Sequence, residues 1–264
     1  MTVLPLVTFV HVSDTHLTGK DHPDYQAHPN AHETTRAVFE QINSLPVPVD
    51  FVLHTGDVGH DPKRESDYMT VLSTLKVLQP PLHVIAGNHD RSKWLYRTVN
   101  GRVPDTYHYA FEVNGVYFAC LDSSIAHQGN GRLGDAQLTW LENIVALPTD
   151  QPLVVVVHHH PIALGSPPMD AIGLNDGEAL HRVLRGARKR VRCVLFGHIH
   201  EDVTIMRDGI LYASARSTWY QTRTWPRQKD FTRDPVQVPG YNLVTIMPNG
   251  DTIIRAYRVP YPTG

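Results

Sequence analysis

Side chains able to bind a metal ion recur along this 264-residue sequence at the points where short apolar runs end. The first run is followed by Asp-Thr-His, and later runs by Gly-Asp, Gly-Asn-His-Asp, His-His-His-Pro and Gly-His-Ile-His. Oxygen and imidazole donors held about 2 Å from an ion are what a reactive metal centre needs. The candidate residues are Asp14, His16, Asp57, Asn88, His89, His158, His159, His160, His198 and His200.

The residue types narrow the chemistry of such a centre. Carboxylate, amide and imidazole donors without thiolates favour Mn, Fe, Co or Zn over Cu(I) or an iron–sulfur cluster. The Asp-x-His and His-x-His spacings place two donors on one side of an extended segment. Glycines before Asp57, Asn88 and His198 allow the backbone to turn sharply beside the ions. One histidine after a strand is usually structural, but five strand ends in register indicate one shared site, because carboxyl ends of strands meet at one edge.

Short β-rich runs alternate with helical patterns, which is typical of layered α/β folds. The expected strands are Leu6–Val12, Asp50–His54, Leu82–Ala86, Tyr107–Val113, Val116–Leu121, Leu153–His158, Cys193–Phe196, Val203–Met206, Ile210–Ser214, Tyr241–Ile246 and Thr252–Tyr257. The expected helices are His32–Ser44, Glu65–Val77, Asp135–Leu147 and Asp176–Lys189.

Three tight hairpins are marked by Asn114-Gly115, Asp208-Gly209 and Asn249-Gly250. Early strands joined by helices suggest a parallel sheet, and the late hairpins an antiparallel one. We therefore predict a four-layer α-β-β-α sandwich of two packed mixed sheets with flanking helices. Residues 1–264 are expected to form a single domain. The polar, aperiodic stretch 219–238 is interpreted as a lid, an oligomer contact or a surface excursion.

The composition is that of an ordinary soluble globular protein, with 41% hydrophobic and 19% charged residues. A net charge of -2 argues against nucleic acid as a partner, and the basic run Arg185–Arg192 is expected at a helix C-terminus. No apolar run approaches the ~18 residues of a membrane span. Cys120 and Cys193 are expected as small buried hydrophobes, and a cytoplasmic location is expected.

Taken together, the five segments resemble the five conserved blocks of the calcineurin-like metallophosphoesterase superfamily, in the same order. The short length and direct succession of the blocks resemble bacterial class III cyclic nucleotide phosphodiesterases and their glycerophosphodiesterase relatives. The resemblance implies two divalent or mixed-valence ions, with iron and manganese expected first and zinc or cobalt as alternatives. One ion would take Asp14, His16, Asp57 and His200. The other would take Asp57, Asn88, His159 and His198.

Within the run of three histidines, the family places its ligand two residues before the proline, which selects His159. Strand alternation agrees, because it points His158 and His160 away from a site that His159 faces. His160 is the alternative. His89 is implied to lie outside the metal shell and to face the leaving group, while Asp90 either orients a site histidine or simply serves the turn.

The resemblance implies hydrolysis of a small phosphodiester, 3′,5′-cyclic nucleotides first, by a hydroxide bridging the two ions. A glycerophosphodiesterase and a small-molecule phosphomonoesterase are alternatives. A non-catalytic scaffold is disfavoured, because such a protein would be expected to have lost ligands or His89. His60 and Asp61 are open to substrate contact, and the segments Gly165–Asp176 and Arg216–Trp219 are expected near the pocket. Homo-oligomerisation through 219–238 stays open.

Overall fold

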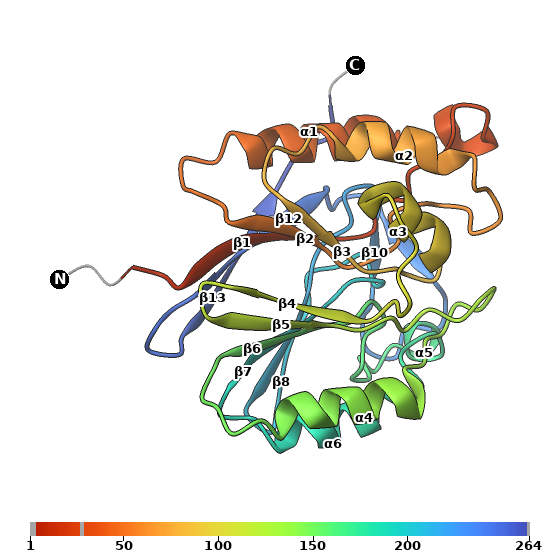
Figure 1. Cartoon of the computed structure of the whole chain (residues 1–264). Helices are drawn as coiled ribbons and strands as arrows, with labels where there is room; N and C mark the ends of the chain where they lie inside the picture. Colours follow the sequence, from red (N-terminus) through yellow and green to blue (C-terminus); the bar gives the residue numbers. More distant parts are fainter. Residues whose placement is uncertain (1–3, 27–28, 263–264) are drawn as a thin grey trace.

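Two β-sheets pack face to face between two layers of helices in the computed structural model, which describes residues 4–26 and 29–262 (Figure 1). The first sheet has the strand order β13-β12-β1-β2-β3. Its strands are β1 (Val7–Val12), β2 (Phe51–His54), β3 (Leu82–Val84), β12 (Gly240–Ile246) and β13 (Thr252–Arg258). β1, β2 and β3 are parallel, whereas β12 and β13 add antiparallel strands beside β1.

The second sheet has the order β4-β5-β6-β7-β9-β8. Its strands are β4 (Tyr109–Val113), β5 (Val116–Cys120), β6 (Leu153–Val156), β7 (Val191–Phe196), β8 (Thr204–Arg207) and β9 (Ile210–Ser214). β5, β6, β7 and β9 run parallel, and β4 and β8 are antiparallel edge strands. The carboxyl ends of the parallel strands therefore form an edge that can collect side chains from distant parts of the chain.

Helices cover the outer face of each sheet. Over the first sheet lie α1 (Ala31–Asn43), α2 (Asp67–Leu75) and α3 (Ser92–Asn100), and over the second lie α4 (Gly134–Val145) and α6 (Gly177–Arg185). The short α5 (Pro167–Asp170) and the 3₁₀ turn η1 (Pro23–Gln26) belong to connecting loops. Asn30 caps the start of α1: its side-chain oxygen accepts hydrogen bonds from the backbone N–H groups of His32 and Glu33 in the first turn, as a favourable N-cap does.

The middle of the sandwich is held by aromatic packing between the two sheets. The ring of Phe9 stacks on that of Phe51, and both meet Phe118 of the facing sheet edge-on, at centroid distances of 5.4 and 5.1 Å. A second apolar cluster fills the space under α1–α3 and a third fills that under α4 and α6. Burial on both faces explains why the central strands read as continuous apolar runs.

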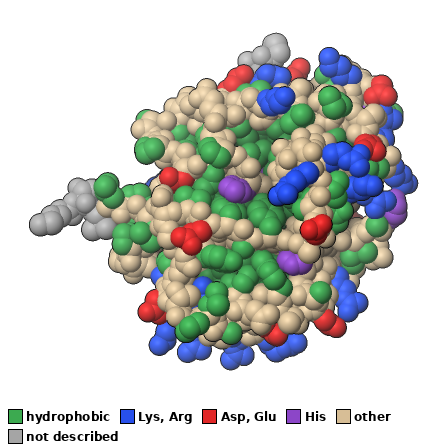
Figure 2. All heavy atoms as spheres, in the orientation of Figure 1, with side chains coloured by type: hydrophobic (Ala, Val, Ile, Leu, Met, Phe, Trp, Pro, Cys, Tyr) green, Lys and Arg blue, Asp and Glu red, His purple; other side chains and the backbone are tan. Residues whose placement is uncertain are grey.

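Charged side chains lie mainly outside these layers, and Figure 2 shows Lys and Arg along the lower margin, over α4 and α6. The basic run Arg185–Arg192 follows α6 and lines a cavity of about 810 Å³ together with the end of α4.

Among the described residues, no helix combines the length and apolar character that crossing a membrane requires. Cys120 and Cys193 are buried free thiols, as expected.

The predicted four-layer sandwich of two mixed sheets is confirmed. The division into an early parallel and a late antiparallel sheet was wrong, because β12 pairs with β1 and each sheet mixes both directions. Asn114 and Gly115 have φ of 51° and 80°, the left-handed values that a tight hairpin turn needs. The helix α3 was not predicted. Within 219–238 the structure places a small hairpin, β10 (Gln221–Arg223) and β11 (Thr232–Asp234).

Candidate metal centre

The five donor-bearing segments meet at the carboxyl edge of the two sheets. Asp14 follows β1, and its carboxylate accepts the backbone N–H of His198, which follows β7 in the other sheet, at 3.0 and 3.1 Å. Asp57 follows β2, and its carboxylate accepts the backbone N–H of His89 at 2.7 Å. These hydrogen bonds join segments that lie far apart in the sequence, so the site depends on both sheets being in place.

An unusual backbone accompanies these donors. Non-glycine residues rarely adopt positive φ, and positions that do so tend to cluster at functional sites. Within the described residues, nine non-glycine residues have positive φ, and five of them are predicted ligands. These five are Asp14, His16, Asp57, His198 and His200. Their side chains therefore converge through left-handed turns, and not through the alternation of an extended segment that the sequence analysis assumed.

Two glycines let the turns pass close to one another. Gly56, with φ of 102°, adopts a conformation that favours glycine. A Cβ on Gly87 would collide with the backbone nitrogen and the carboxylate of Asp57. Glycine is thus required directly before both Asp57 and Asn88 for the two loops to meet.

The first group of donors consists of Asp14, His16 and His200, with Asp57 close by. Nε2 of His16 lies 3.0 Å from Nε2 of His200, and 3.6 Å from a carboxylate oxygen of Asp57. The other ring nitrogen of His200, Nδ1, lies 2.9 Å from the carbonyl oxygen of Tyr220, to which it donates. A hydrogen bond from Nδ1 to a fixed acceptor orients Nε2 toward a metal ion.

His158 shows the same arrangement in the second group. Its Nδ1 donates to the carbonyl oxygen of Thr55 at 2.7 Å. Its Nε2 lies 3.1 Å from Oδ1 of Asn88 and 3.4 Å from Oδ2 of Asp57. The Nε2 atom of His158 is therefore directed at Asn88 and Asp57, two residues expected from the sequence to bind the second ion.

His159, the residue chosen from the sequence, is placed differently. Its Nδ1 lies 2.7 Å from the hydroxyl of Ser123 and its Nε2 lies 3.2 Å from the carbonyl oxygen of Gly129, so both ring nitrogens have partners. β6 ends at Val156, and the alternation used to select His159 does not extend to it. His160, the alternative, is buried with its Nε2 3.9 Å from Asp170. The geometry favours His158.

The electrostatics of the site suit cations. Burial lowers the pKa of both His16 and His198 well below the usual value, so these rings are neutral donors near pH 7. Burial opposes ionisation of Asp57, yet nearby histidines, His158 foremost, hold its pKa well below its usual value. Burial alone would lower the pKa of His158. The charge of Asp57 outweighs the effect of burial and raises the pKa of His158 to about 9. A proton thus sits where a cation would otherwise compensate Asp57.

His198 provides a separate indication that the donors suit a metal. Its side chain is buried, and its Nε2 has no hydrogen-bond partner among the described residues. An unpaired buried polar nitrogen is costly unless a ligand satisfies it. Its ring centroid is 5.1 Å from that of His158, and donor nitrogens of His158, His159 and His198 all lie within 4.8 Å of one another, so these imidazoles could serve one ion.

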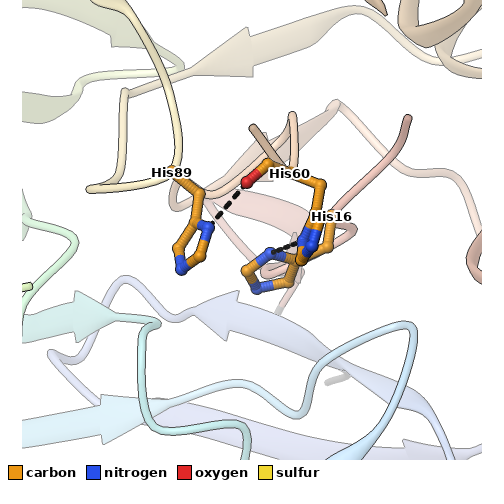
Figure 3. Close-up of side chains that lie close together, drawn as sticks. All are labelled: His16, His60 and His89. Carbon is orange, nitrogen blue, oxygen red and sulfur yellow. Dashed lines mark hydrogen bonds between the residues drawn. The ribbon is translucent and has the colours of Figure 1, made fainter. Parts of the chain in front are cut away.

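His89 lies beside the donors on the loop after β3. Its Nδ1 donates to the backbone carbonyl of His60 at 2.7 Å, which leaves Nε2 as the free ring nitrogen (Figure 3). Its ring packs edge-on against that of His16, with centroids 4.7 Å apart. His89 also lines an open cavity of about 750 Å³, the size of a small-molecule site. The cavity is lined by His22, Asp24, His60, Asp61, Pro62, Lys63, Asn88, His89, His127, Gln128 and Gly129.

Asp90 serves the loops: within residues 4–26 and 29–262 its hydrogen-bond partners are backbone N–H groups and a tyrosine hydroxyl. Its two oxygens accept hydrogen bonds from the backbone N–H groups of Val58, Gly59 and Gly87, and from the hydroxyl of Tyr68. Burial and the charge of Asp57 raise the pKa of Asp90 to about 6. Of the two roles considered for it, the turn role is the one that these contacts support.

Residues of the segment after β9 close another side of the site. Trp219 is buried and lies against His16 and His60, with ring centroids 5.7 and 5.4 Å apart. The ring of Tyr220 lies 4.5 Å from that of His200, and the guanidinium of Arg233, on β11, lies 3.9 Å above Tyr220. Arg216–Trp219 was expected near the pocket from the sequence, whereas the contacts of Tyr220 and Arg233 beside the ligands were not.

Similarity to known proteins agrees with this site. The sequence profile of the calcineurin-like phosphoesterase family matches residues 7–202, so the chain belongs to that family. It is a phosphoester hydrolase by family, and the dinuclear metal centre of such enzymes fits the His and Asp groups described above.

Individual relatives resemble the chain over nearly its whole length. A Pseudomonas aeruginosa protein named 3′,5′-cyclic adenosine monophosphate phosphodiesterase CpdA is 32% identical and aligns over 92% of this chain and 87% of its own length. A probable glycerophosphodiester phosphodiesterase GpdQ from Arcobacter nitrofigilis is 28% identical over 96% of this chain and 95% of its own. A dimetal phosphatase from Danio rerio shares the fold, with a TM-score of 0.67, 16% identity and coverage of 98% and 100%.

Proposed function

We propose that this phosphoesterase hydrolyses small phosphodiesters, with 3′,5′-cyclic nucleotides as the first substrate class and glycerophosphodiesters as the second. The observation that carries the proposal is the pair of donor groups sharing Asp57, open to a cavity that His89 lines. The names of the relatives at 32% and 28% identity support diesters over monoesters.

For the ion ligands we propose Asp14, His16, Asp57 and His200 around one ion, and Asp57, Asn88, His158 and His198 around the other. His158 replaces the sequence-based choice of His159, because its Nε2 is directed at Asn88 and Asp57. Oxygen and imidazole donors suit manganese or iron, and also zinc or cobalt. When bound, the two ions supply Lewis acidity to the phosphoryl oxygens and activate water for attack.

The protein's own groups complete the reaction. Asp57 holds its carboxylate between the two donor groups, and the fixed Nδ1 hydrogens of His158 and His200 keep their Nε2 lone pairs directed inward. Because the Nδ1 hydrogen of His89 is held by the carbonyl oxygen of His60, the ring would act as an acid only when Nε2 also carries a hydrogen. That hydrogen would go to the departing alkoxide, which is a poor leaving group without a proton. The cavity beside His89 would take the rest of the substrate.

The test is a substrate panel with metal-depleted protein reconstituted with Mn²⁺. Cyclic AMP, 2′,3′-cyclic AMP, glycerophosphocholine and p-nitrophenyl phosphate are compared under the same conditions. We expect turnover of at least one diester, loss of turnover with chelator, and recovery on adding Mn²⁺. Turnover of the monoester alone would contradict the assignment to diesters.

A matched pair of variants connects turnover to the site. Asp57→Asn is expected to abolish hydrolysis and to reduce the bound metal, since Asp57 serves both donor groups. Asp105→Asn removes the same charge from an exposed position outside the site and should change neither. Full activity with two ions in the Asp57 variant would overturn the shared-ligand assignment.

A further inference from the structure

His60 lies between a proposed metal ligand and the proposed proton donor, and the backbone fixes it there. The backbone N–H groups of His16 and Leu17 donate to the carbonyl oxygens of Asp57 and Val58, at 3.0 and 2.9 Å. The backbone N–H of His60 in turn donates to the carbonyl oxygen of Leu17 at 3.0 Å. The loops after β1 and β2 are thus paired like short strands, which holds His60 beside His16.

The ring of His60 contacts the ring of His16 nitrogen to nitrogen. Nδ1 of His60 lies 3.3 Å from Nδ1 of His16 (Figure 3). Because Nε2 of His16 points into the site and must keep its lone pair for an ion, the hydrogen of His16 belongs on Nδ1. Nδ1 of His60 then has to be the acceptor of that hydrogen.

The remaining hydrogen of His60 also has a partner. With Nδ1 accepting, a neutral His60 carries its hydrogen on Nε2, which lies 3.4 Å from a carboxylate oxygen of Asp24. Asp24 is half exposed at the rim of the cavity, whereas His16 is buried. A chain of three side chains therefore runs from the rim to the metal ligand: Asp24, His60 and His16.

The backbone of the same residue contacts the other side of the site. The carbonyl oxygen of His60 accepts the Nδ1 hydrogen of His89, and the two rings stack with centroids 5.5 Å apart. Both ring nitrogens of His60 and Nδ1 of His89 are thereby engaged. These contacts explain the cluster of His16, His60 and His89 as hydrogen-bonded neighbours, without a third ion.

We propose that His60 is a positioning residue that sets the ring orientation of His16 through its side chain and that of His89 through its backbone carbonyl. The inference rests on the proposed metal centre. The two roles of His60 can be separated by mutation, because a substitution removes the side-chain acceptor for His16 but leaves the backbone carbonyl that accepts from His89. Loss of the ring should therefore weaken metal binding far more than it slows the metal-saturated enzyme.

The test compares His60→Leu with His60→Asn in the full-length protein, using calorimetric titration with Mn²⁺ after chelator treatment. Removing a partner that orients a ligand typically weakens metal binding about 10- to 100-fold. We expect His60→Leu to raise the dissociation constant of one Mn²⁺ by that factor. His60→Asn keeps an oxygen acceptor near the position of Nδ1 and should restore most of the affinity. At saturating Mn²⁺, kcat should fall by a much smaller factor than the Mn²⁺ affinity in both variants.

His108→Leu is the matched control, because His108 packs on Trp140 away from the site and should leave Mn²⁺ affinity unchanged. Wild-type affinity in His60→Leu, or an Asn variant no better than the Leu variant, would overturn the inference. If the Leu variant does not fold, Asp24→Leu decides: it removes the acceptor for the Nε2 hydrogen of His60 and should weaken Mn²⁺ binding, and unchanged affinity overturns the chain of contacts. Wild-type protein that binds no Mn²⁺ would overturn the proposed centre itself, and the inference with it.

Discussion

Nε2 of His158 lies 3.1 Å from Oδ1 of Asn88, although the two residues are 70 positions apart and belong to different sheets. Asp57 lies beside both segments: one carboxylate oxygen lies 3.4 Å from Nε2 of His158, and the other accepts the backbone N–H of His89, next to Asn88. The Nδ1 hydrogen of His158 is held by the carbonyl oxygen of Thr55, directly after β2. The imidazole is thus oriented by one sheet while its backbone belongs to the other.

The first prediction separates His158 from its neighbour His159. His158→Gln should lower turnover by more than about 100-fold and reduce bound Mn²⁺, since losing even an outer partner of a ligand costs about 10- to 100-fold. His159→Gln keeps an amide able to bond Ser123 or Gly129 and should retain two ions. Metal content by elemental analysis and kcat are measured for both. The reverse pattern would restore the sequence-based choice of His159.

Much of the site could be predicted because its donors occur in short segments directly after recognisable strands. Asp14, His16, Asp57, Asn88, His198 and His200 are all brought to one edge by the predicted sandwich. Within His158–His160 the sequence chose His159, whereas the geometry favours His158, and the difference has a physical reason. β6 ends at Val156, and beyond a strand end the direction of a side chain depends on local turns that periodicity does not describe.

Other features depend on contacts between distant segments and left no pattern in the sequence. Tyr220 and Arg233 lie in an aperiodic polar stretch, and only the β10–β11 hairpin brings Arg233 over the ring of Tyr220. The pairing of β12 with β1 was likewise missed, because sequence patterns report strands better than they report partners. His60 was noted from its position three residues after Asp57, but its contact with His16 was not foreseen. The single-domain prediction and the lid or oligomer role of 219–238 stay predictions.

The second prediction concerns His89 as the proton donor. His89→Ala should keep both Mn²⁺ ions but lose about 10²- to 10⁴-fold in kcat on cyclic AMP, the usual contribution of general acid catalysis. With bis(p-nitrophenyl) phosphate the loss should be much smaller, because p-nitrophenolate departs without a proton. Equal losses on both substrates would instead indicate that His89 binds the phosphoryl group. Loss of an ion would move His89 among the ligands.

The third prediction concerns Arg233. Its guanidinium is exposed above Tyr220, whose ring packs on the proposed ligand His200, so it places a positive charge near an anionic substrate. Arg233→Ala should raise KM for cyclic AMP by roughly 3- to 10-fold with little change in kcat, as expected for a partly screened surface charge. The effect should shrink at high ionic strength. The control is Arg188→Ala, which removes the same charge from the basic run after α6. If that variant raises KM by the same factor, the effect of Arg233 comes from net charge and not from its position near the site.

The fourth prediction concerns pH and His11, which is buried in β1 with its Nε2 on the hydroxyl of Thr55. Burial lowers the pKa of His11 from 6.5 to about 3. The unfolded chain therefore binds a proton below pH 6.5 that the folded protein does not, so this group reduces stability as pH falls from 6.5 toward 3. His11→Gln keeps a hydrogen-bonding group and cannot titrate. The free energy of unfolding is measured with urea on metal-depleted wild type and variant at pH 7.5 and at pH 5. The difference, variant minus wild type, should be about 2 kcal/mol more favourable to the variant at pH 5 than at pH 7.5. A gap that stays constant with pH would show that His11 is protonated equally in both states.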